Sequence, residues 1–167
     1  MSNETGAIYL REVLRALRQY KDLGEGALAQ VPADRLGFAL DAEANSIAVL
    51  VQHLAGNMRS RFTDFLTTDG EKPDRNRDGE FENPARVTAE AVRAQWEEGW
   101  RVVFAAVEPL RPADLERRVA IRGEPLSVLE ALNRALAHYA YHVGQLVLLA
   151  KHLREGEWQT LSIPRKR

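Results

Sequence analysis

The sequence contains no cysteine among its 167 residues. Disulfide bonds, thiolate metal ligands and a cysteine nucleophile are therefore excluded. A chain without disulfides is compatible with a reducing compartment. The N-terminal stretch MSNETGAIYLREVLRALRQY has no basic start followed by an apolar run, so we expect no secretory signal. Together these absences predict a cytoplasmic protein.

Long apolar runs and an excess of one charge are also missing. No stretch approaches the roughly 20 apolar residues that a membrane helix needs, so no membrane partner is expected. Lys and Arg together number 23 and Asp and Glu 24, which gives a formal net charge of -1. Because no global field attracts polyanions, and no basic surface with interleaved aromatics or glycine-rich phosphate motif is present, we expect no nucleic-acid partner.

The composition that remains is that of an ordinary globular protein. Apolar residues make up 45% and charged residues 28% of the chain. A chain of this length favours a single domain over residues 1–167, and it can bury a core without help from a metal or a disulfide.

Four segments carry apolar residues at intervals of three or four, the spacing of amphipathic helices. These helices are expected at about residues 7–30, 41–67, 87–108 and 127–153. Between the second and third lies TTDGEKPDRNRDGEFENP, residues 67–84, a charged segment that we interpret as a long crossover loop. Residues 116–127 read as a small hairpin around Arg122-Gly123. The predicted fold is an all-α four-helix bundle with a long crossover between helices 2 and 3 and a hairpin before helix 4.

The helix ends have candidate caps of uneven strength. Asn3 or Thr5 is expected to cap the first helix and Asp41 or one of its neighbours the second, whereas Thr88 is a weaker signal for the third. The fourth begins with the capping box Ser127-Val128-Leu129-Glu130. Two glycines, Gly24 and Gly26, are expected to weaken the last turn of the first helix.

Two histidines lie four residues apart in HYAYHVGQ, residues 138–145. On a helix His138 and His142 share one flank of the apolar stripe, where both imidazoles can reach one ion. The pair is not a zinc-protease motif, because Tyr139 stands where that motif has glutamate. Two core histidines satisfied by hydrogen bonds are the alternative.

A metal site needs a third ligand, and His53 is the best candidate. It flanks the apolar stripe of the second helix, and Gly56 beside it permits close approach of another group. His152 falls farther around the fourth helix and is expected at the surface. Three neutral imidazoles would leave a coordination position open, which is typical of catalytic rather than structural sites. Spacing alone leaves metal binding and core histidines open.

The sequence resembles the DinB/YfiT-like superfamily. The resemblance rests on His53 within HLAGNMRSR, on the closing HYAYHVGQ, and on residues 45–81, which are similar to a branch known mainly as a domain of unknown function. It covers nearly the whole chain and implies a four-helix bundle with up-down-down-up topology. It also implies a divalent ion, nickel or zinc, bound by His53, His138 and His142, and a homodimer.

Some members of that superfamily transfer low-molecular-weight thiols to electrophiles, which implies such a small-molecule reaction here. With no cysteine in the chain, the sulfur must come from an exogenous thiol, which the ion would bind as thiolate. A metal-dependent hydrolase is the close alternative. A non-catalytic bundle that binds metal or another ligand is the alternative from a different class.

Further candidates surround the histidines. Asn57 and Arg61 follow His53 at one-turn intervals and are candidate substrate-binding residues. Equally simple roles are a hydrogen bond within the bundle for Asn57 and an ion pair of Arg61 with Asp64 or the acidic loop. The loop at residues 69–82 is expected to shape the entrance of the site. Its DRNRDGE only begins like a calcium loop, because Ala85 replaces the final glutamate, so a salt-bridged loop is favoured.

Two remaining features concern packing. Trp96 and Trp100, one turn apart, are expected in the core rather than as a substrate shelf. The first helix has apolar residues over a wide arc, including Ile8 and Tyr9, and the excess would suit a two-fold dimer interface. Packing of that arc on the crossover or the hairpin is the alternative.

Overall fold

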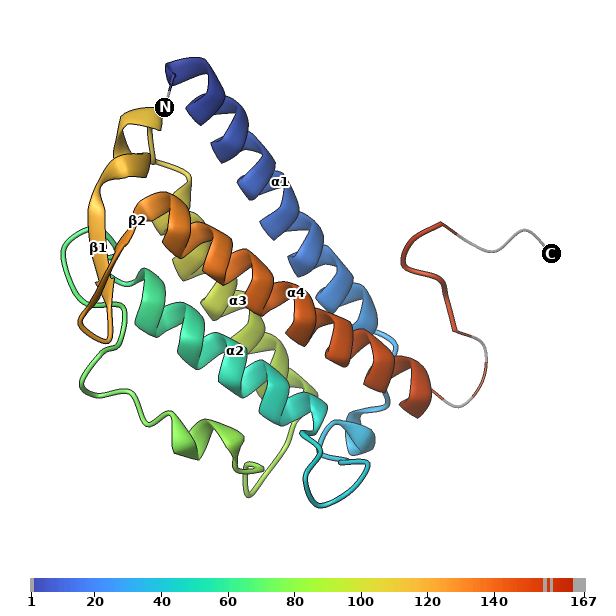
Figure 1. Ribbon diagram of the computed structural model, residues 1–167. Coiled ribbons are helices and arrows are strands. Elements are labelled where there is room, and N and C mark those ends of the chain that lie inside the picture. The colour runs from blue at the N-terminus through green and yellow to red at the C-terminus, as the bar shows by residue number, and fades with distance from the viewer. Residues whose placement is uncertain (1, 155, 157, 164–167) are drawn as a thin grey trace.

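Four long helices form a bundle in the computed structural model (Figure 1). The structure describes residues 2–154, 156 and 158–163, so the expected domain boundaries at residues 1 and 167 lie outside the described residues. The helices are α1 (Asn3–Leu28), α2 (Ile47–Phe62), α3 (Ala89–Val107) and α4 (Val128–Leu153). Figure 1 shows α1 and α4 running one way and α2 and α3 the other. The expected all-α bundle with up-down-down-up topology is confirmed.

Helix α1 begins earlier than its apolar pattern indicated. The N-cap is Ser2, whose hydroxyl accepts a hydrogen bond from the Thr5 amide, so neither Asn3 nor Thr5 is the cap. The helix continues through Gly24 to Leu28. The glycine makes room for Trp96, because a Cβ at position 24 would overlap the indole ring. Tyr9 links α1 to the first turns of α4 by donating to the Asn133 side chain at 2.8 Å.

Helix α2 is shorter than predicted at both ends. Ser46 caps it by accepting from the Val49 amide, whereas Asp41 instead accepts backbone hydrogen bonds in the preceding loop. The helix ends at Phe62 because the chain reverses at Asp64, which has a positive φ of 49°. Phe65 lies beyond the helix and is nevertheless buried, so its helical spacing reflected burial alone.

The other two helices match their predicted start signals. Thr88 caps α3 by accepting from the Ala91 amide. Ser127 and Glu130 form the expected capping box of α4, each satisfying the other's backbone. Strands β1 (Arg118–Ile121) and β2 (Glu124–Ser127) pair antiparallel, as the hairpin prediction required.

One hydrophobic cluster contains buried residues from all four helices. At its centre Trp96, Trp100 and Tyr139 are almost completely buried, which confirms the core assignment of both tryptophans. Trp100 packs edge-on against Trp96 and Tyr139, and such aromatic pairs add to the stabilisation from burial.

The connection between α2 and α3, residues 63–88, is held by hydrogen bonds to the hairpin. Gly70 donates its amide to the Ala120 carbonyl at 2.8 Å, and the Asp69 carboxylate accepts from the amides of Arg122 and Gly123 at the hairpin turn. The connection also contains a short 3-10 turn, Asp78–Phe81, that the sequence did not predict. These contacts hold the hairpin against the connection that follows α2.

The calcium-like pattern in this connection does not form a cation site. Asn76 uses its side-chain oxygen to accept from the Gly79 amide, and the Asp78 side chain is 97% exposed. The salt-bridged loop is the arrangement found, with Arg75 paired to Glu71 and Glu80.

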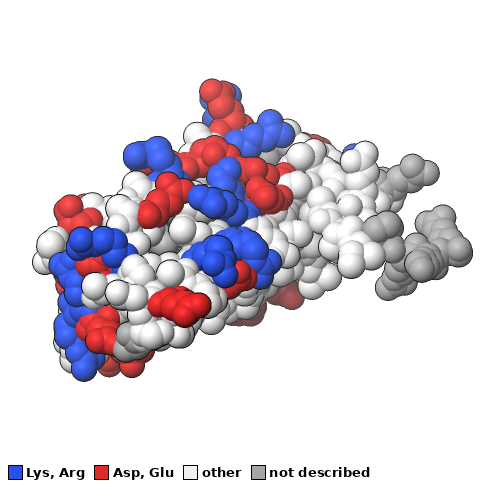
Figure 2. Space-filling model, turned by 90° about the horizontal axis from the view of Figure 1, so that it is seen from above, with Lys and Arg blue, Asp and Glu red and all other residues white. Residues whose placement is uncertain are grey.

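The surface carries both charges. Figure 2 shows basic and acidic side chains interspersed on the face seen from above. Over the described part of the chain, no helix combines the length and apolar character needed to cross a membrane.

Candidate metal centre

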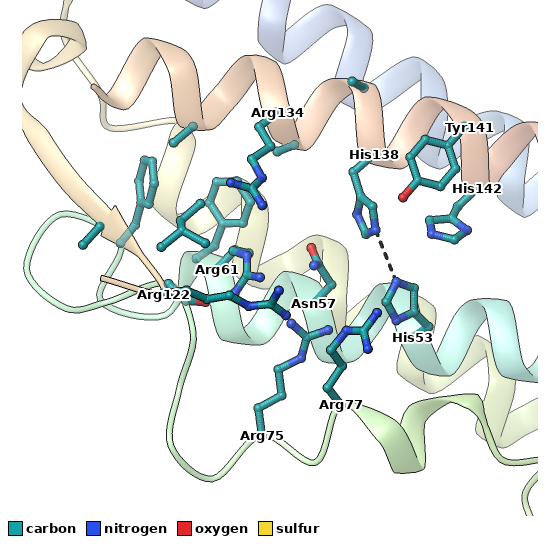
Figure 3. Close-up of a pocket in the computed structure, with 18 of the residues that line it drawn as sticks. His53, Asn57, Arg61, Arg75, Arg77, Arg122, Arg134, His138, Tyr141 and His142 are labelled. Atoms are coloured by element: carbon teal, nitrogen blue, oxygen red, sulfur yellow. Dashed lines mark hydrogen bonds between the residues drawn. The ribbon is translucent and has the colours of Figure 1, made fainter. Parts of the chain in front are cut away.

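Three histidines from two helices converge at one point of the bundle. His53 comes from the middle of α2, and His138 and His142 come from successive turns of α4 (Figure 3). One ligand nitrogen from each lies within 4.8 Å of the other two. His53 and His142 are buried, and His138 is partly buried. The structure thus brings together the three histidines that the sequence singled out, and it leaves His152 exposed as expected.

His53 is oriented by a carboxylate on its far side. Its Nδ1 lies 2.9 Å from Glu80 Oε2, and because Glu80 also receives hydrogen bonds from Arg75, the carboxylate accepts and the imidazole donates. Burial raises the pKa of Glu80, but the hydrogen bonds from Arg75 and His53 outweigh it and leave that pKa below its usual value. The proton on Nδ1 leaves the lone pair on Nε2, facing the other histidines.

His142 is held in the same tautomer by a neutral partner. Its Nδ1 lies 2.8 Å from the side-chain oxygen of Gln145, which can only accept. Its Nε2 therefore carries a lone pair as well. Burial lowers the pKa of His142 to about 4, so the ring is neutral near pH 7.

His138 is the least constrained of the three. Its Nε2 lies 3.2 Å from His53 Nε2, whereas its buried Nδ1 has no partner within the described residues. Because no group fixes its tautomer, its Nε2 is free either to donate to His53 or to present a lone pair. Burial, followed by the neighbouring histidines and then Arg61 and Arg75, lowers the pKa of His138 to about 3, which also keeps this ring neutral.

The donor set fits a borderline divalent ion. Neutral imidazole nitrogens suit zinc, nickel and copper, and two ligands of a tetrahedral ion are about 3.3 Å apart, close to the spacing of His53 and His138. The candidate cluster in the described residues contains these three histidines and no fourth ligand. Three ligands would leave a coordination position open, and all three histidines border a pocket.

The pocket has a volume of about 520 Å³, a size that suits a small organic molecule. All three histidines line it, and other walls come from the hairpin and from the connection, which contributes Arg75, Arg77 and Phe81. The segment 69–82 therefore does shape the site.

Asn57 and Arg61 both line the pocket, yet both also have partners in the protein. Tyr139 donates a long hydrogen bond of 3.5 Å to Asn57 Oδ1, and Arg61 pairs with Glu71 of the connection at 2.9 Å. Arg61 also donates to the Gly70 carbonyl. The structural partners considered from the sequence are thus present, with Glu71 and not Asp64 paired to Arg61, while both side chains remain accessible from the pocket.

Sequence reasoning missed the two residues that orient the imidazoles. Gln145 had a detectable signal, because it lies one turn after His142 on the same face of α4. Glu80 had none, because it is one of several acids in a charged segment. Gly56 was recognised as a point of close approach, and the group that approaches is the Glu80 carboxylate, which a Cβ at position 56 would overlap.

Fold and site together define an α-helical bundle protein with a candidate three-histidine metal centre beside an open pocket. A family model described as "Protein of unknown function (DUF1572)" matches residues 4–167, and the chain belongs to this family. The expectation of a family known mainly as a domain of unknown function is therefore confirmed. No curated protein and no solved structure matches the chain.

Proposed function

We propose that the protein is a divalent-metal-dependent enzyme that transfers a low-molecular-weight thiol to an electrophilic small molecule. His53, His138 and His142 hold the ion, and nickel or zinc is the expected metal. The observation that carries the proposal is the meeting of three imidazoles, with no fourth protein ligand in the described residues, at the wall of an open pocket. The resemblance to the DinB/YfiT-like superfamily supports the same function.

The bound ion would lower the pKa of a thiol or water molecule that binds beside it. The chain's own residues would orient the imidazoles and position the substrate. Glu80 and Gln145 keep the His53 and His142 lone pairs aimed at one point. Asn57 and Arg61, which border the same pocket, position the substrate.

Hydrolysis by the same ligand set is the alternative reaction. Among the described residues, no aspartate or glutamate lines the pocket, so no carboxylate is positioned there as a general base for water. Thiol transfer needs no such base, because the thiol can lose its proton on binding the ion. The open pocket also favours an enzyme over a non-catalytic metal-binding bundle, for which a sealed site would be expected.

Metal analysis of histidine variants tests the proposal. His138→Ala and His142→Ala should each lose most of the bound divalent ion, measured by elemental analysis, while circular dichroism shows unchanged helix content because the core does not depend on the ion. His152→Ala is the matched control, since it removes an exposed histidine from the same helix. If both pocket variants keep stoichiometric metal, the ligand assignment is wrong.

A screen of several thiols and electrophiles then tests the reaction. The purified protein loaded with zinc or nickel should transfer a thiol, and His142→Ala should lose that activity in proportion to its loss of metal. Hydrolysis without thiol dependence would establish the alternative reaction instead. A cytoplasmic location and a homodimer belong to the same proposal, and the dimer is taken up at the scale of the whole molecule.

A further inference from the structure

Arginine is the dominant charged residue of the pocket. Five arginines line it, and they come from α2, the connection, the hairpin turn and α4: Arg61, Arg75, Arg77, Arg122 and Arg134. Figure 3 shows them on the side of the pocket that extends from His53 and His138 toward the hairpin. No acidic residue is among the lining residues in the described part of the chain.

Three of these arginines share a single carboxylate. Glu71 lies 2.9 Å from Arg61, 3.3 Å from Arg75 and 2.9 Å from Arg122. Glu80 offers Arg75 a second partner, but that carboxylate also serves His53. The two carboxylates of Glu71 and Glu80 therefore do not fully neutralise the three guanidinium groups that they contact.

The other two arginines are available to a ligand. Within the described residues, Arg134 forms no ion pair or side-chain hydrogen bond, although it projects from α4 one turn before His138. Arg77 lies over the Phe81 ring at 5.3 Å, and its ion pair is with the exposed Asp78 at 3.5 Å. Both guanidinium groups keep planar sets of N–H donors, which match the oxygens of a carboxylate or a phosphate.

The arginines of this wall lie close enough to repel one another. Burial lowers the pKa of Arg61, and repulsion from Arg75 and Arg122 lowers it further against the opposing attraction of Glu71. A cationic ligand would be repelled here, whereas an anionic group would be bound by several donors at once.

We propose that the pocket takes a ligand bearing at least one carboxylate or phosphate group. Arg77 and Arg134 bind this anionic group from different walls of the pocket, while the rest of the ligand extends toward the histidines. The inference deepens the proposed function by assigning its substrate class. It does not need the ion, because the anion subsite is formed by the chain alone. Anion binding and metal binding can therefore fail separately.

Titration of the full-length ¹⁵N-labelled chain, monitored by NMR, tests the subsite directly. Inorganic phosphate and succinate are added to the protein both as purified and after chelation of metal. Each should cause saturable shifts centred on the amides of Arg77 and Arg134. The anion with the lower Kd identifies the preferred group, and succinamide, the neutral analogue of succinate, should cause no such shifts.

Arginine variants test whether Arg77 and Arg134 form the anion subsite. The double variant Arg77→Gln/Arg134→Gln should raise the Kd by roughly tenfold to a hundredfold, the usual effect of losing charged hydrogen bonds. Arg93→Gln, which removes an exposed arginine of α3 outside the pocket, should bind like the wild type. The proposal is overturned if neither anion gives saturable shifts, if succinamide binds equally well, or if the double variant binds as the wild type does. None of these results bears on the metal content of the histidine variants.

Discussion

Glu80 contacts the candidate metal centre only through His53, and its replacement should show how far that contact matters. Glu80→Gln preserves shape but removes the charge that holds the Nδ1 proton and the Arg75 guanidinium. Partners of this kind typically contribute a factor of about 10 to 100 in metal affinity. We expect zinc affinity, measured by competition with a chelating dye, to fall by that factor while helix content is unchanged.

The neighbouring acid provides the control for this experiment. Glu82 is exposed, so Glu82→Gln should leave zinc affinity at the wild-type value. Equal affinity of the Glu80 and Glu82 variants would mean that Glu80 only anchors the connection and does not tune His53.

The buried histidines predict how stability depends on pH. The pKa values of His138 and His142 are lowered from 6.5 to about 3 and about 4, in each case first by burial. Below about pH 6.5 the unfolded chain takes up protons that the folded chain rejects, so the free energy of unfolding falls as the pH falls toward those folded values. Each histidine contributes up to about 1.4 kcal/mol per pH unit in that range.

Urea unfolding of the metal-free protein between about pH 7 and pH 5 measures this slope. The variant His138→Ala/His142→Ala should show a shallower dependence, because its folded state no longer excludes those two protons. The same slope in both proteins would show that these histidines are not the groups responsible.

At the residue scale, the sequence identified the three candidate ligands because histidine is rare here and its spacing is informative. Four histidines occur in the chain, and their positions on helical faces separated His152 from the other three. The arginines of the pocket could not be recognised in the same way. They come from four different segments, and only the path of the connection brings Arg77 to the same cavity as Arg134.

At the scale of the elements, the close contact between α1 and α3 predicts a marked effect of one added methyl group. Gly24→Ala would place a Cβ where the Trp96 ring now lies, and the ring is buried with little room to move. We expect a loss of about 1–3 kcal/mol in the free energy of unfolding, measured by urea denaturation, as is typical of overpacking.

Gly144→Ala is the matched control within a helix. A Cβ at that position would meet nothing within 4 Å, so the higher helix propensity of alanine should stabilise the protein by about 0.5–1 kcal/mol. Equal effects of the two substitutions would contradict the close packing of Trp96 on α1.

The elements also show why helix ends were harder to predict than helices. Ser127-Val128-Leu129-Glu130 is a local motif whose two hydrogen bonds satisfy each other, and it marked the start of α4 correctly. The end of α2 depends instead on Asp64, whose positive φ fits the way the connection folds back onto the bundle. Apolar spacing continued past that reversal because Phe65 is buried by tertiary contacts.

At the scale of the whole molecule, a homodimer remains the prediction of the superfamily resemblance. The wide apolar arc of α1 is largely used within the bundle, since Leu10 and Val13 are buried and Tyr9 bonds to α4. Exposed apolar side chains remain on Ile8 of α1 and on Tyr141 and Leu148 of α4. Sedimentation at micromolar concentration should give twice the 18.8 kDa mass of one chain. A monomer mass that does not change on concentrating the sample would contradict the dimer.

The distances along the chain between the histidines have a consequence for folding. His53 and His138 are 85 residues apart in sequence, and Glu80 comes from the connection between them. A partly folded chain in which α4 has not docked on α2 offers at most the His138 and His142 pair. An ion that needs all three ligands would therefore bind only the completed fold, would stabilise it by mass action, and would slow its unfolding more than it speeds its folding. Metal loading would then act as a check that the chain has finished folding.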